Sequence, residues 1–263
     1  MIFKHNQFIL VLGLAATLLV MSSCQKAPPK TALDAQGRSQ AETTLASLQQ
    51  KYDWQGLLAF GQVRVRGGGR SESFDAALLV QSPDLVTLEI INDLGQVLTR
   101  VVADGHQILY EDTQQKTYNL LGNDTAALKK ALHLPISPQE FVARLLLKIP
   151  QEEIVGVGVQ KNAVTGATVK QVEGANYLIG FDEKNQQLLE VRRWKSAGAR
   201  KELYRIEYQA KPDAAYPGQI VWRFQKPKVE VTVRFEEVTR KDSSPPQKFD
   251  THPPEGWSSG EIR

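Results

Sequence analysis

The feature that most constrains the fold is a long succession of strand-like segments, separated by turn residues about every ten positions. They occupy residues 58–66, 74–82, 85–93, 95–105, 106–112 and 116–121, and then 152–162, 167–174, 176–185, 187–196, 200–210, 218–227 and 228–240. In the last of these, Val229, Val231, Val233 and Phe235 alternate with polar residues, which is typical of a strand with one face in water. The spacing predicts consecutive antiparallel strands in a barrel or sandwich, rather than parallel βαβ units.

Several of these strands are apolar on both faces. In 95–105, Leu98 and Val102 point to one side of the strand, whereas Val97 and Val101 point to the other. A sheet with two apolar faces must be covered on both, or must use one face to hold a ligand.

Three helices are predicted to provide cover. Residues 40–54 place Ala41, Leu45, Leu48 and Tyr52 on one helical face, and Gly56 ends the helix. Residues 123–134 have Asn123 or Asp124 as a possible N-cap and an apolar face.

The third helix, 137–150, has the strongest local pattern in the chain. Ser137 is the expected N-cap, Pro138 stands at the first helical position, and Glu140 is the expected reciprocal residue of a capping box. The apolar stripe that follows, up to the stop at Pro150, fits either an ordinary core helix or a lid over an apolar concavity.

The first 23 residues resemble a bacterial lipoprotein signal peptide. The apolar run 8–20 is too short for the roughly 20 residues of a spanning helix. It is followed by Ser22, Ser23 and Cys24, an arrangement that resembles a lipobox, although Met21 replaces the usual leucine. The alternative is an ordinary signal peptide beside an unmodified cysteine. A lipidated Cys24 would carry three acyl chains and anchor the chain to a membrane, and residues 24–39 would form a flexible tether.

Composition excludes several chemistries. Cys24 is the only cysteine, so the chain has no disulfide, no other thiol nucleophile and no cysteine-ligated zinc site. The remaining histidines, His106, His133 and His252, have no metal-ligand spacing, and we expect no metal, no cofactor and no enzymatic activity. The chain has 32 Lys and Arg against 29 Asp and Glu, and loss of Lys4 with the signal leaves a net charge of +2. This near-neutral charge gives no indication of nucleic-acid binding.

The predicted organisation is therefore a signal peptide (1–23), a lipidated N-terminus and tether (24–39), one domain (40–240) and a Pro-rich tail (241–263). The tail has few apolar residues, and we expect it to be mobile.

Motifs of the first half, in their order, resemble the LolB family of outer-membrane lipoprotein receptors. They run from FGQVRV through LEIINDLGQVLTRVVADGHQILYEDTQQKTYNLL to LPISPQEFVARLLLKIP, about half of the mature chain. Asp93 departs from the family's Asn-Pro-Leu-Gly turn. The resemblance implies a mainly β fold with α-helices: an incomplete antiparallel barrel whose apolar cavity is covered by lid helices.

It also implies a function: a monomer that receives the acyl chains of lipoproteins from a LolA-like periplasmic carrier and inserts them into the membrane. Gln25 after the cysteine implies sorting to the outer membrane, where the domain would face the periplasm. The alternatives are a binding protein for another amphiphile, such as a glycolipid, and a structural accessory lipoprotein of an envelope assembly.

Two sets of residues are candidates for this activity. In the family the leucine of the Asn-x-Leu-Gly turn protrudes and is needed for membrane insertion, which assigns that role to Leu94 with Gly95; an incidental surface leucine is the alternative. Candidates for the cavity wall are apolar residues of the strands and the lid helix, each of which could instead be ordinary core: Leu79, Val86, Leu88, Ile90, Val101, Ile108, Phe141, Leu145 and Trp222.

Overall fold

The computed structural model describes residues 35–161, 168–182, 186–195, 201–211 and 214–262. The expected signal peptide (1–23), Cys24, Gln25 and the tether as far as residue 34 lie outside the described residues. Within the described part, no helix has the length and apolar character needed to cross a membrane.

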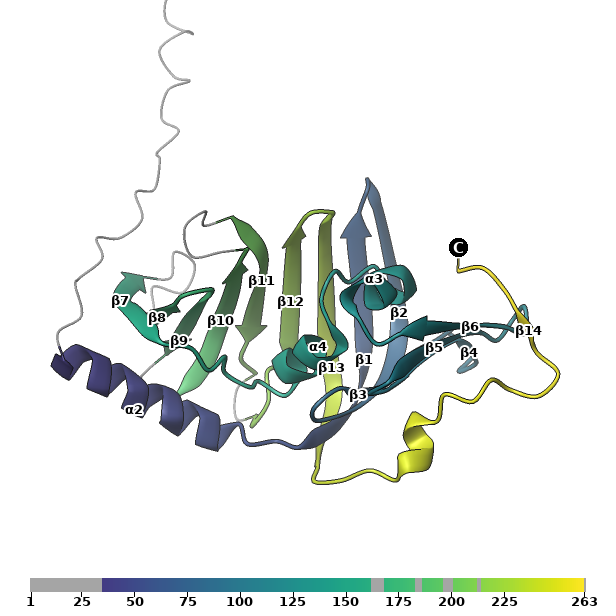
Figure 1. Ribbon diagram of the computed structural model, residues 1–263, viewed down its shortest axis with the longest axis horizontal. Helices are drawn as coiled ribbons and strands as arrows, with labels where there is room; N and C mark the ends of the chain where they lie inside the picture. The colour runs from purple at the N-terminus through teal and green to yellow at the C-terminus, as the bar shows by residue number, and fades with distance from the viewer. Residues whose placement is uncertain (1–34, 162–167, 183–185, 196–200, 212–213, 263) are drawn as a thin grey trace, which may run out of the picture.

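The described strands form one open, curved sheet (Figure 1). Its order is β14-β6-β5-β4-β3-β2-β1-β13-β12-β11-β10-β9-β8-β7, with antiparallel neighbours except for the parallel pair β14 and β6. The strands are β1 (Gly56–Gly67), β2 (Arg70–Gln81), β3 (Leu85–Ile91), β4 (Val97–Asp104), β5 (Gln107–Asp112), β6 (Thr117–Gly122), β7 (Ile154–Lys161), β8 (Thr168–Gly174), β9 (Tyr177–Asp182), β10 (Gln187–Trp194), β11 (Glu202–Gln209), β12 (Gln219–Gln225), β13 (Lys228–Lys241) and β14 (Ser258–Ser259). The prediction of an incomplete antiparallel barrel is confirmed.

The sheet consists of two meanders joined at one seam. Strands β1 to β6 pair in chain order, as do β7 to β13, and β1 pairs with β13 at the centre of the sheet. The seam has a bulge between Phe60 and Gly61. A Cβ atom at Gly61 would lie 2.1 Å from the carbonyl oxygen of Arg234, so only glycine fits at this point of the seam.

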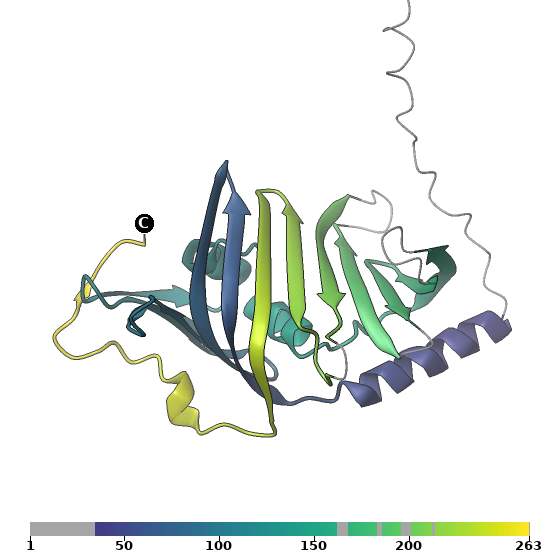
Figure 2. The same ribbon diagram turned by 180° about the vertical axis from the view of Figure 1, so that it is seen from behind.

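Three helices lie against this sheet: α2 (Ala35–Lys51), α3 (Thr125–Leu132) and α4 (Pro138–Leu145). Helices α3 and α4 stand in front of the strands in Figure 1 and behind them in Figure 2, so both cover the same face, which we call the inner face. Helix α2 contacts β7. It begins at Ala35 instead of Gln40, and the end of the expected tether is therefore helical, in keeping with the helix-forming Ala, Gln and Arg residues there.

The predicted N-caps are present. The side chain of Asp124 accepts a hydrogen bond from the Ala127 N–H at 2.8 Å, and that of Ser137 accepts one from the Glu140 N–H at 3.2 Å. The prediction that Glu140 completes the capping box is wrong. Its side chain turns toward the sheet, where Tyr177 and Arg193 donate hydrogen bonds to it. Glu140 is only 9% exposed.

The inner face and the helices enclose the main apolar core. It includes Val101 and Ile108 of the sheet, Leu48 of α2, Tyr52 just after that helix, and Leu128 of α3. The opposite, outer face carries a second, smaller buried cluster, formed by Val102, Leu109 and Phe249. The expectation that β4 is apolar on both faces, with Val101 and Val102 on opposite sides, is confirmed.

Phe249 belongs to the C-terminal segment, residues 241–262, which was expected to be mobile. The structure instead places this segment against the outer face, where Phe249 is 4% exposed. The Thr251 hydroxyl donates a hydrogen bond to Asp104 Oδ2 at 2.6 Å, and β14 pairs with β6. The burial of Phe249 and these hydrogen bonds hold residues 241–262 against the sheet, although few residues of the segment are apolar.

Candidate functional site

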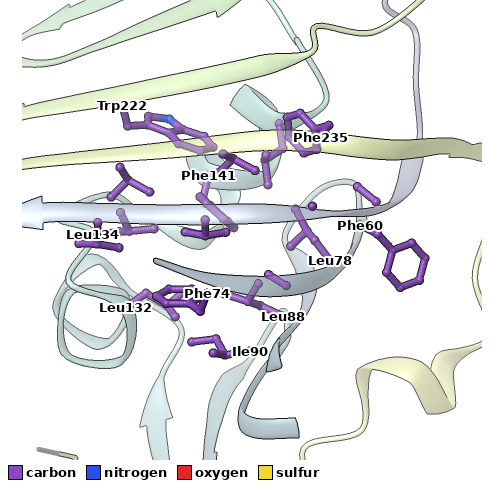
Figure 3. A pocket seen from close by; sticks show the side chains of 18 residues that line it. Phe60, Phe74, Leu78, Leu88, Ile90, Leu132, Leu134, Phe141, Trp222 and Phe235 are labelled. Carbon is purple, nitrogen blue, oxygen red and sulfur yellow. The ribbon is translucent and has the colours of Figure 1, made fainter. Parts of the chain in front are cut away.

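The inner face contains an apolar cavity between the centre of the sheet and the helices α3 and α4 (Figure 3). Its volume is about 70 Å³, counted over the positions that the centre of a water molecule can take. Strands β1, β2, β3, β12 and β13 and the α3–α4 region provide the wall: Ala59, Phe60, Gly61, Val63, Val65, Phe74, Ala76, Leu78, Leu88, Ile90, Leu132, Leu134, Phe141, Leu145, Trp222, Val231, Val233 and Phe235.

Five of the nine candidate wall residues border this cavity: Leu88, Ile90, Phe141, Leu145 and Trp222. Phe141 and Trp222 pack against each other in this wall, with ring centroids 5.7 Å apart. Their role in binding a ligand remains a prediction.

The other four candidates lie elsewhere. Val86, Val101 and Ile108 are buried in the same core but do not border the cavity. Leu79 lies on the outer face, beside the cluster around Phe249. The alternation of β2 explains this, because Leu78 and Val80 are the residues that point inward.

The sequence interpretation missed most of the wall contributed by β1 and β2, such as Ala59, Val63, Ala76 and Leu78. These residues alternate along paired strands, with Gly61 opposite Ala76 and Ala59 opposite Leu78. The alternation was visible in the sequence, but the face that it buries is set by pairing with β13, some 170 residues away in the chain.

No side chain of the cavity wall carries an ionisable group. Across the residues that the structure describes, no group of three or more His, Cys, Asp or Glu is placed to hold a metal ion. The wall therefore offers dispersion contacts and burial of apolar surface, the interactions that bind an aliphatic or aromatic ligand.

Helix α4 is fixed to the second meander by buried polar groups. The Glu140 carboxylate accepts hydrogen bonds from the hydroxyl of Tyr177 at 2.7 Å, from the hydroxyl of Tyr204 and from the guanidinium of Arg193. The hydroxyls of Tyr208 and Tyr216 donate to the backbone carbonyls of Arg144 and Leu145, at 3.2 and 2.5 Å.

Electrostatics keep the tyrosine hydroxyls of this network protonated. Burial, with the negative charge of Glu140, raises the pKa of Tyr177 to about 12 and raises that of Tyr204 further. Burial also raises the pKa values of Tyr208 and Tyr216. The hydrogen bonds show all four hydroxyls as donors, and the raised pKa values keep them protonated to higher pH than in the unfolded chain.

The architecture has counterparts among solved structures. A LolA superfamily protein from Nitrosomonas europaea has a TM-score of 0.51 and 9% sequence identity, over 78% of this chain and 97% of its own. A DUF1329 family protein from Desulfovibrio piger has a TM-score of 0.51 and 7% identity, over 81% of this chain and 97% of its own. The chain has a LolA-like fold.

At sequence level, no family model and no curated protein matches the chain. With identities this low, the structural likeness concerns the fold alone. The LolB-like motifs of the first half remain a resemblance, and function has to be argued from the cavity itself.

Proposed function

We propose that this chain is a lipid-anchored protein of the outer membrane that takes up the acyl chains of other lipoproteins in its apolar cavity and inserts them into the membrane. The observation that carries the proposal is the cavity: a wall of apolar side chains, formed by a half-barrel and covered by helices. An acyl chain is the ligand that such a wall favours, because it needs no polar partner along its length.

The cavity is narrow in this structure. Pockets that hold drug-sized ligands measure about 300–1,000 Å³, well above the volume found here. An acyl chain would therefore have to displace part of the wall on entry.

The turn between β3 and β4 supports the insertion step. Leu94 is 82% exposed, and the Asn92 side chain holds the turn by accepting hydrogen bonds from the N–H groups of Leu94 and Gln96 at 3.0 and 2.9 Å. Gly95, with φ of 77°, supplies the left-handed conformation that closes the turn. The same turn shares a hollow with Phe60 and Ala76 of β1 and β2, beside the cavity.

The sequence supplies the remaining parts of the proposal. A lipidated Cys24 would anchor the chain, Gln25 would direct it to the outer membrane, and a LolA-like periplasmic carrier would deliver the clients. We infer a monomer that needs no cofactor and performs no covalent chemistry, since moving an acyl chain between two apolar sites requires only a difference in affinity.

The uptake of an acyl chain can be tested with the Cys24→Ser mature chain, which carries no lipid of its own. A brominated fatty acid that enters the cavity should quench the fluorescence of Trp222, and Trp222→Phe should remove that quenching. Ala76→Phe and Leu88→Phe fill the cavity and should abolish uptake, whereas Leu120→Phe, at an exposed position of β6, should not.

Native mass spectrometry of the same chain separates the alternatives. A co-purified lipoprotein acyl chain supports the proposal, and a glycolipid in its place would support a carrier of another amphiphile. A cavity that stays empty with every lipid offered, or filled variants that bind as well as the parent chain, would overturn it and favour an accessory role in an envelope assembly.

A further inference from the structure

A second hollow lies on the outer face of β1 and β2, beneath the C-terminal segment. The register pairs Phe60 with Ala77 and Leu58 with Leu79, and strand alternation directs these four side chains to the outer face. Phe60, beside the bulge of β1, also borders the inner cavity. Figure 3 shows the ring of Phe60 apart from the side chains that fill the cavity. We call this hollow the outer groove, and these four residues form its floor.

The C-terminal segment crosses the outer groove without filling it. The Ser244 N–H donates to Gln81 Oε1 at 2.7 Å, and the Thr87 hydroxyl donates to the Lys248 carbonyl at 2.5 Å. These bonds hold the segment on either side. Its buried aromatic ring, Phe249, packs with Val102 and Leu109 beside Leu79, at one edge of the groove, and does not fill it. Phe60 therefore remains 42% exposed.

The space that is left is large enough for a ligand. Counted in the same way as the cavity, the outer groove measures about 400 Å³. This volume lies within the range of about 300–1,000 Å³ typical of pockets for small ligands.

Basic residues outnumber acidic ones at the rim. Lys241 and Lys248 border the groove, and within the described part of the chain neither has a carboxylate within ion-pair distance. Glu89 is the one acidic residue that borders it, and its carboxylate is 3.6 Å from the Arg100 guanidinium. Among the described residues, two lysines without an ion-pair partner thus border a hollow whose floor is apolar.

We propose that the outer groove binds a single-chain anionic amphiphile. Its aliphatic chain lies on Leu58, Phe60 and Leu79, and its carboxylate or phosphate group is bound by Lys241 and Lys248. The sheet lies between this site and the inner cavity, and only Phe60 and Leu78 border both. The proposal does not depend on the function proposed above.

The first test uses the Cys24→Ser mature chain with dodecanoate and dodecyl phosphate as probes, below their micelle concentrations, and with dodecanol as the uncharged match. Native mass spectrometry should show a second bound anion beyond any molecule in the cavity. Lys241→Glu with Lys248→Glu should weaken that site about tenfold or more for anions, and not for dodecanol. Lys226→Glu with Lys228→Glu makes the same charge change in the exposed β12–β13 turn and should have no effect.

A second test uses neighbouring alanines on opposite faces of β2. Ala77→Phe should abolish anion binding at the outer site and leave the quenching of Trp222 by a brominated chain intact. Ala76→Phe should abolish that quenching and leave anion binding at the outer site intact. If Ala77→Phe does not fold, the comparison of the Lys241→Glu, Lys248→Glu variant with the parent chain decides whether the outer groove binds the anion. A preference for one anion would identify the head group, carboxylate or phosphate, and supports the proposal.

The proposal is overturned if anion binding is the same in the lysine variants and the parent chain, or if the control pair weakens it equally. Loss of Trp222 quenching in Ala76→Phe would still support the inner cavity in that case. The two proposals therefore fail separately.

Discussion

At the scale of single residues, Leu94 is a large apolar side chain held out into solvent by a turn of defined geometry. If it inserts into the membrane surface, its burial is worth roughly 1.5–3 kcal/mol, which is small beside a lipid anchor but enough to position the turn. We expect Leu94→Glu to change the free energy of unfolding by less than about 0.5 kcal/mol, because the side chain makes few contacts.

In this variant, acyl chains should still enter the cavity, and clients should stall before release into the membrane. Transfer from a loaded carrier to liposomes would measure the two steps separately, with Leu120→Glu as the control at another exposed leucine. Normal delivery by Leu94→Glu would contradict the assignment of this turn.

The buried tyrosines predict how stability depends on pH. In the unfolded chain a tyrosine has a pKa near 10, whereas burial and the charge of Glu140 raise the pKa of Tyr177 to about 12 in the folded chain. The folded state thus binds its protons more tightly, so this contribution to stability is fully present below pH 10 and is lost as the pH rises through about 12.

Urea unfolding at pH 8 to 11, with tyrosinate absorbance as a second probe, should show stability falling above pH 10. Tyr177→Phe should be less stable at pH 8 but lose stability less steeply above pH 10. An unchanged slope in that variant would show that Tyr177 does not titrate with unfolding.

At the scale of elements, the two lid helices are held in different ways. Glu140 and two backbone carbonyls of α4 accept hydrogen bonds from β9, β10, β11 and Tyr216. For α3, residues 125–132, no side-chain hydrogen bond to the sheet occurs in the described part, and its contacts to the core are apolar. Apolar contacts lack fixed directions, so α3 can shift at lower cost than α4.

We therefore expect α3 to be the element that moves when the cavity opens. Amide hydrogen exchange should be faster in α3 than in α4 in the empty chain, and a bound acyl chain should change protection mainly in α3 and residues 133–136. Equal protection of the two helices, or a ligand effect confined to α4, would contradict this.

Most elements follow from local sequence, whereas their partners do not. Periodicity located the strands within a few residues, and Ser137 with Pro138 located the start of α4. The role of Glu140 was missed because its partners lie 37, 53 and 64 residues away. Leu79 was assigned to the wrong face because adjacent residues of a strand point to opposite faces, so a shift of one position exchanges the inner cavity for the outer surface.

At the scale of the whole molecule, the chain closes its sheet on both faces with its own segments. The second apolar face noted in β4 is covered by the C-terminal segment through Phe249. We expect Phe249→Ala to lower the free energy of unfolding by about 3 kcal/mol, because a buried ring is lost.

Trp257 is a half-buried aromatic residue in the same segment, and Trp257→Ala should lower the free energy of unfolding clearly less than Phe249→Ala does. Chemical denaturation of both variants gives the comparison. A loss below about 0.5 kcal/mol for Phe249→Ala would mean that the segment does not stabilise the outer face.

The central seam also determines when the molecule can fold. Strand β1 lies near the start of the domain, and its partner β13 is the last long strand. The cavity, which both border, therefore cannot form until β13 has been made as far as Phe235. Contacts of such sequence separation are slow to form because a long loop must close first. If residues 1–23 direct export as proposed, this topology would keep the chain from completing a stable core before translocation.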